Sequence, residues 1–155
     1  MNYREQRRLV FKGLLSCSLL AVTSLIPTLS LAAWPKKAFK ATTLNSAIEQ
    51  LENGIEPEKS SKIKIKAPKL AENGSIVWIE VTTTLEDVES ISILVEKNPS
   101  PLAAKFLISS GTEAYIYTRI KMRESSPVIA LVKTGDGKLY TAQRDIKVTL
   151  GGCGG

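Results

Sequence analysis

The sequence contains no histidine and only two cysteines, Cys17 and Cys153. Histidine is the commonest protein metal ligand and the usual base that activates a serine or cysteine nucleophile. Its absence excludes imidazole-based metal sites and the Ser-His and Cys-His pairs of hydrolases. The acidic residues do not replace it, because Glu86, Asp87 and Glu89 fall in a predicted turn and no calcium-loop spacing is present. We therefore expect neither a catalytic set nor a metal site.

A strong charge of one sign is also lacking outside the first residues of the chain. Residues 1–33 hold four basic residues and one acidic residue. Removing these from totals of 21 and 15 lowers the net charge from +6 to +3. So small an excess gives no indication of a nucleic-acid partner.

Residues 1–33 are predicted to be an export signal that is cleaved. A basic segment ends at Lys12, an uncharged stretch covers residues 13–31, and small residues near Ala32 offer a cleavage site. The alternative is a membrane anchor, but serines, threonines and Pro27 make the stretch poorly hydrophobic for one. Arg7-Arg8 is similar to a twin-arginine signal, although Phe11 lies one place later than usual, which leaves the general secretory route open. We expect a periplasmic protein with no membrane anchor after cleavage.

The rest of the chain is predicted as a leader over 34–41, a domain over 42–150, and a terminal arm over 151–155. Leu44, Ala47, Ile48 and Leu51 share one face of a short helix that Gly54 and Pro57 end. From Lys62 onward the pattern has a period of two, and turn signals recur about every ten residues. The fold class expected is all-β, an immunoglobulin-like β-sandwich of about seven strands with a short N-terminal helix. The strands are expected in 62–70, 76–84, 89–98, 104–110, 114–122, 127–134 and 139–150.

Two segments are candidates for contact with a partner. Lys62, Lys64, Lys66 and Lys69 form a basic stripe that either protects a strand edge or faces an acidic surface. The segment 96–106 is either an interaction loop anchored by Leu102 and Phe106 or a plain connection between strands.

The chain ends "VTLGGCGG", in which Gly151, Gly152, Gly154 and Gly155 surround Cys153. Glycine gives the backbone its greatest freedom, so we expect a flexible arm that carries the thiol into clefts of other proteins. A lone cysteine in an oxidising compartment pairs with another molecule, carries a modification or stays reactive. The alternatives are therefore a covalent carrier, a binding module with an intermolecular disulfide, and a thiol enzyme. A terminal thiocarboxylate on Gly-Gly, as in ubiquitin-like sulfur carriers, does not suit an exported protein.

The ending "KVTLGGCGG" resembles that of the SoxY family, the sulfur carriers of the periplasmic thiosulfate-oxidising system. The resemblance continues through residues 62–81, 93–106, 118–122 and 137–155. It implies that Cys153 is the site of covalent sulfur attachment, and that the carrier binds no cofactor and performs no turnover of its own.

The resemblance also implies a set of partners. They are a SoxZ-like β-sandwich subunit in a heterodimer, a c-type cytochrome complex that joins thiosulfate to the cysteine, and a di-manganese hydrolase that releases sulfate. In some organisms a molybdenum-haem sulfane dehydrogenase oxidises the remaining sulfur.

Overall fold

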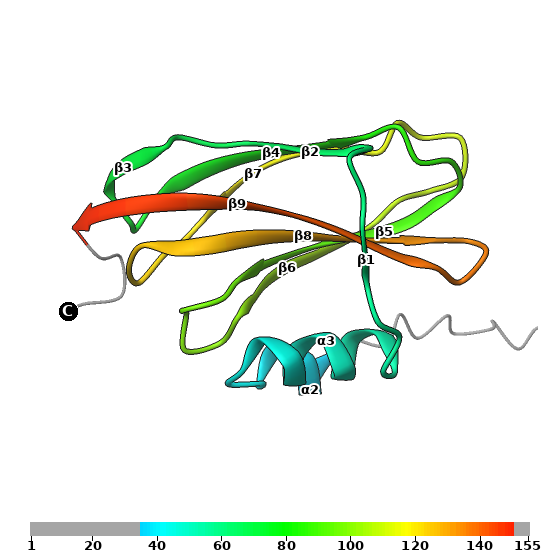
Figure 1. The fold of residues 1–155 in the computed structure, drawn as a ribbon, viewed down its shortest axis with the longest axis horizontal. Coiled ribbons are helices and arrows are strands. Elements are labelled where there is room, and N and C mark those ends of the chain that lie inside the picture. The colour runs from blue at the N-terminus through cyan, green and yellow to red at the C-terminus, as the bar shows by residue number, and fades with distance from the viewer. Residues whose placement is uncertain (1–34, 151–155) are drawn as a thin grey trace, which may run out of the picture. The chain divides into compact units, whose positions relative to one another are not determined.

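The computed structural model describes residues 35–150, which form two helices and nine strands in two packed sheets (Figure 1). The six-stranded sheet has the order β1-β9-β8-β5-β6, with β3 also paired to β9, and the three-stranded sheet has the order β2-β4-β7. The predicted all-β sandwich with a short N-terminal helix is confirmed. The bounds are α2 (Lys36–Phe39), α3 (Leu44–Glu52), β1 (Glu58–Lys59), β2 (Ile63–Lys66), β3 (Leu70–Asn73), β4 (Val77–Thr83), β5 (Val88–Val95), β6 (Leu102–Leu107), β7 (Tyr115–Ile120), β8 (Ser126–Thr134) and β9 (Leu139–Leu150).

The main core lies between the two sheets, and it is built from alternate side chains of each strand. In β4, Val77, Ile79 and Val81 are buried while the residues between them face outward. Strand β8 instead buries both faces, because Val128, Ala130 and Val132 point into the sandwich and Ile129 and Leu131 point to the opposite side. Burial on two faces explains why the centre of β8 reads as a continuous apolar run.

The helices cover the outer face of the large sheet, on the side away from β2, β4 and β7 (Figure 1). Ala47 and Leu51 of α3 pack on Leu94, Leu131 and neighbouring apolar residues of the sheet. Thr43 caps the start of α3, since its side chain accepts a hydrogen bond from the Ser46 amide at 3.2 Å. Asn53 and Gly54, with φ angles of 53° and 81°, turn the chain out of the helix.

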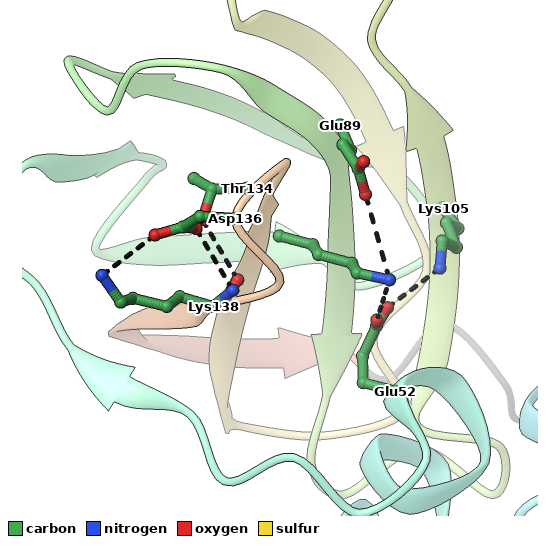
Figure 2. A network of polar contacts seen from close by, with 7 residues as sticks. Glu52, Glu89, Lys105, Thr134, Asp136 and Lys138 are labelled. Atoms are coloured by element: carbon green, nitrogen blue, oxygen red, sulfur yellow. Dashed lines mark hydrogen bonds and ion pairs between the residues drawn. The ribbon is translucent and has the colours of Figure 1, made fainter.

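A buried carboxylate joins α3 to the large sheet (Figure 2). The Glu52 side chain is 2% exposed, and its Oε1 lies 2.9 Å from Lys105 Nζ of β6. Glu52 Oε2 lies 3.5 Å from Lys133 Nζ of β8, which is also 3.9 Å from Glu89 Oε2. A buried carboxylate needs such partners because removal from water penalises its charge. The cluster therefore fixes the end of α3 over two strands.

Two details differ from the sequence-based expectations. The segment 34–41, expected to be a loose leader, contains the helix α2, and its Ala38 and Ala41 are buried against the second apolar cluster. Strands β1 and β3 were not anticipated, since each is short and pairs in parallel with the distant strand β9. No helix within residues 35–150 is long and apolar enough to cross a membrane.

Candidate functional site

The described part of the chain, residues 35–150, contains neither histidine nor cysteine. No group of three or more acidic residues in that part is arranged to hold a metal ion. The predicted site residues Gly151, Gly152, Cys153, Gly154 and Gly155 lie outside the described residues, as does Cys17 in the predicted signal. The structure therefore describes only the surroundings of Leu150, the residue that precedes the predicted arm.

The last strand is held tightly up to the residue before the predicted arm. Strand β3 pairs with the end of β9, with Leu70 opposite Lys147 and Asn73 opposite Leu150. The Gly74 amide donates a hydrogen bond to the Leu150 carbonyl at 2.7 Å. On the other edge of β9, the Val148 amide donates to Ser125 Oγ at 2.9 Å. We call this anchored end, Lys147–Leu150 with Asn73 and Gly74, the arm root.

The loop between β7 and β8 lies against the arm root. The Met122 amide donates to the Gly74 carbonyl at 2.7 Å, so Lys121 and Arg123 are brought beside the end of β9. The Asn98 side chain fixes this loop, because its amide nitrogen donates to the Lys121 carbonyl at 2.8 Å and its oxygen accepts from the Arg123 amide at 2.9 Å.

The exposed residues Lys121 and Arg123 thus flank Met122, whose backbone is bonded to Gly74 of the arm root. Sequence reasoning missed them, because they are about thirty positions from Cys153 in the chain. A backbone contact through Gly74, rather than any motif, brings them to the arm root.

The distance between the arm root and the thiol is limited by covalent geometry. Each extended residue spans about 3.5 Å, so the Cα atom of Cys153 lies no more than about 10 Å from that of Leu150. Leu150 itself is 69% exposed. Any protein that encloses the Cys153 sulfur must therefore approach the arm root closely.

The other candidate groups do not form a site in the structure. Asp87 occupies a turn with a φ of 50°, and Glu86 and Asp87 are exposed, as expected for solvated turn charges. Glu89 is exposed too, but its predicted place in the turn is wrong, because it lies in β5 with its Oε2 3.9 Å from Lys133 Nζ. Asp136 lies in the hairpin before β9. Hydrogen bonds from the Thr134 hydroxyl and then from Lys138 lower the pKa of Asp136 from 3.8 to about 2 (Figure 2). This arrangement stabilises the turn and leaves the carboxylate no proton to exchange near neutral pH.

The interaction loop suggested over 96–106 is a hairpin between β5 and β6. Leu102 is 3% exposed and packs in the cluster under the helices, and Phe106 packs partly against the main core. Leu102 is therefore a core residue rather than an exposed anchor, and Phe106 is half-buried. A role of the segment in contact with a partner stays a prediction.

Together, the fold and the site define a small β-sandwich protein whose described body has no histidine or cysteine and whose last strand ends just before a terminal Gly-Gly-Cys-Gly-Gly. Residues 49–153 match the model of the family described as sulfur oxidation protein SoxY. The chain belongs to the SoxY family, and its role is that of a carrier in sulfur oxidation.

Solved structures agree with this assignment. The sulfur carrier protein SoxY from Chlorobium limicola f thiosulfatophilum is 35% identical, with a TM-score of 0.64 over 75% of this chain and 100% of that one. A superoxide reductase (neelaredoxin) from Ignicoccus hospitalis is 16% identical, with a TM-score of 0.51 over 56% of this chain and 80% of that one. The second likeness shows the fold alone. A search among curated proteins gave no match.

Proposed function

We propose that the chain carries the intermediates of thiosulfate and sulfide oxidation covalently on the thiol of Cys153. The observation that carries the proposal is the position of this residue. It follows an anchored strand by three residues, in a sulfur-oxidation family, on a body whose described part has no other thiol and no imidazole. Residues 151–155 serve as the arm that presents the sulfur.

The proposed chemistry takes place in two steps, each performed by a partner enzyme. In the first, the Cys153 sulfur bonds to the outer sulfur of thiosulfate. The thiol loses its proton, and two electrons pass to the c-type cytochrome complex. In the second, a di-manganese hydrolase adds water across the sulfur–sulfonate bond. Sulfate and a proton leave, and a persulfide remains on Cys153. A sulfane dehydrogenase is the proposed acceptor of that persulfide where one is present.

The body of the protein supplies binding and position rather than turnover. The cations of Lys121 and Arg123 beside the arm root suit the negative charge that the thiosulfonate group gives the arm. The chain works in the periplasm after export and pairs with a SoxZ-like β-sandwich subunit. It needs no cofactor beyond the sulfur that it carries.

The proposal is tested by sulfur loading in vitro. The mature chain is incubated with thiosulfate and the cytochrome complex, and its intact mass is recorded beside that of Cys153→Ser. We expect a thiosulfonate adduct on the wild-type chain and none on the variant. Turnover of thiosulfate by the chain alone would instead indicate a thiol enzyme. Accumulation of disulfide-linked dimers without any sulfur adduct would indicate a binding module with an intermolecular disulfide.

A further inference from the structure

The outer face of the three-stranded sheet carries a row of exposed aromatic and basic side chains. Antiparallel pairing places Trp78 of β4 opposite Arg119 of β7, Glu80 opposite Tyr117, and Thr82 opposite Tyr115. On the other side of β4, β2 contributes Lys64 and Lys66 opposite Thr82 and Glu80. Because side chains alternate along a strand, all of these lie on the face away from the core. We call them the aromatic face: Lys64, Lys66, Trp78, Glu80, Thr82, Tyr115, Tyr117 and Arg119.

The exposure of the aromatic face is not explained by the packing of the described chain. Trp78, Tyr115 and Tyr117 are 41%, 45% and 55% exposed, whereas the outer face of the large sheet is covered by α2 and α3. Contiguous exposed apolar surface marks an interaction site, and tryptophan, tyrosine and arginine are the residues that most often dominate binding energy at interfaces. Trp78, Tyr115, Tyr117 and Arg119 of the aromatic face are therefore of the residue types enriched at protein–protein interfaces.

The charges on the aromatic face select the kind of partner. Lys66 is already paired, since its Nζ lies 2.6 Å from Glu80 Oε1. Lys64 and Arg119 are exposed on either side of the aromatic row, and neither forms an ion pair within residues 35–150. A second copy of the chain would bring these cations against their own counterparts. A different protein with carboxylates around an apolar patch would compensate them.

Of the strands that carry the aromatic face, β4 begins and β7 ends close to the arm root. Val77 pairs with Ile120 at the end of the small sheet, next to Gly74, which bonds the Leu150 carbonyl. The exposed side chain of Ile76, at 63%, lies in the chain between Gly74 and Trp78. A partner bound on this face would therefore sit beside the origin of the arm without having to enclose Cys153.

We propose that the aromatic face is the surface on which this chain binds its partner subunit, and that the partner offers an apolar patch rimmed by carboxylates. The inference takes the existence of a partner subunit from the proposed function and adds the surface and the chemistry of recognition. Of the predicted basic stripe, it gives a role in facing acidic groups to Lys64 alone, because Lys66 is paired with Glu80 and Lys62 and Lys69 lie outside β2.

The test measures binding of the purified SoxZ-like subunit to the mature chain by calorimetry. Tyr117→Glu places a charge at the centre of the face, and we expect it to raise Kd by about tenfold or more. Leu107→Glu is the matched control, because Leu107 is 73% exposed on β6 of the other sheet, and its Kd should stay within about twofold. Since both positions are exposed, urea midpoints should show that both variants are folded.

The electrostatic part of the proposal has its own pair of variants. We expect Arg119→Glu to weaken binding most at low salt and less at high salt, because added ions screen exposed charges. Lys59→Glu makes the same charge change on β1 and should leave Kd and its salt dependence unchanged.

Trp34→Phe leaves Trp78 as the sole tryptophan of the chain, so a blue shift of its emission on binding reports directly that the face is covered.

Several outcomes would overturn the proposal. They are wild-type affinity for Tyr117→Glu, equal losses for Tyr117→Glu and Leu107→Glu, unchanged Trp78 emission in the complex, and absence of any binding by the wild-type chain. A dimer of the chain alone that Tyr117→Glu dissociates would assign the face to a second copy instead. Sulfur loading of Cys153 is measured without the partner subunit. A wrong assignment of the binding surface can therefore be distinguished from a wrong assignment of the carrier function.

Discussion

Shortening the proposed arm at its root should strongly reduce enzymatic loading while sparing the chemical reactivity of the thiol. The starting point of the arm is fixed, because the Leu150 carbonyl is held by the Gly74 amide at 2.7 Å and β3 pairs with the end of β9. At about 3.5 Å per extended residue, Cys153 reaches about 10 Å from Leu150. Deletion of Gly151 and Gly152 reduces this reach to about 3.5 Å. The sulfur would then lie against the body, where an enclosed active site cannot admit it.

The assay compares two reactions of the same thiol. Loading with thiosulfate by the cytochrome complex is followed by intact mass, and alkylation by iodoacetamide is followed under the same conditions. We expect at least about a tenfold loss of loading, which corresponds to about 1.4 kcal/mol, and little change in alkylation.

Deletion of Gly154 and Gly155 is the matched control, because it also removes two glycines but does not alter the distance from the arm root to the sulfur. The reasoning is refuted if both deletions slow loading equally, or if the first deletion loads at the wild-type rate.

Three further predictions concern the body. Thr43→Ala removes the cap of α3 and should lower the free energy of unfolding by about 1 kcal/mol in urea titrations, and an unchanged midpoint would contradict the capping role. Glu52→Ala should lower the free energy of unfolding by about 2 kcal/mol. The loss is smaller than that expected for a fully buried ion pair, because the Lys105 and Lys133 side chains are 19% and 33% exposed. Glu49→Ala, on the exposed side of the same helix, is the control, and equal losses would remove the special role of Glu52. The lowered pKa of Asp136 means that its ionised form stabilises the fold above pH 3.8 and that this contribution is lost as the pH falls through about 2. The stability of Asp136→Asn should therefore fall less than that of the wild type between pH 3.8 and about 2, as measured by urea titrations at each pH. An identical loss of stability in both proteins would contradict the effect.

The fold class could be predicted because its signals are local, whereas the covalent site at Cys153 stays a prediction. The alternation of Ile63 and Ile65 with lysines, and of Val77, Ile79 and Val81 with polar residues, reports one buried face per strand. Cys153, which lies alone among glycines, can be recognised from residues 148–155 of the sequence.

Features that depend on contacts between distant segments could not be predicted. Strand β3 contains Glu72 and Asn73, which favour a turn, and it forms because β9 offers an unpaired edge almost eighty residues later. Ala38 is buried only because α3 and the large sheet enclose it. In the same way, Lys121 and Arg123 reach the arm root through the pairing of Met122 with Gly74, and no motif encodes that contact.

The central claim is tested most directly by mass spectrometry of the protein purified from cells that are oxidising thiosulfate. We predict that the C-terminal peptide carries sulfane sulfur or thiosulfonate on Cys153, and that these adducts disappear when the cells are deprived of reduced sulfur. A C-terminal peptide whose thiol is unmodified throughout active thiosulfate oxidation, in cells that depend on this chain, would contradict the account.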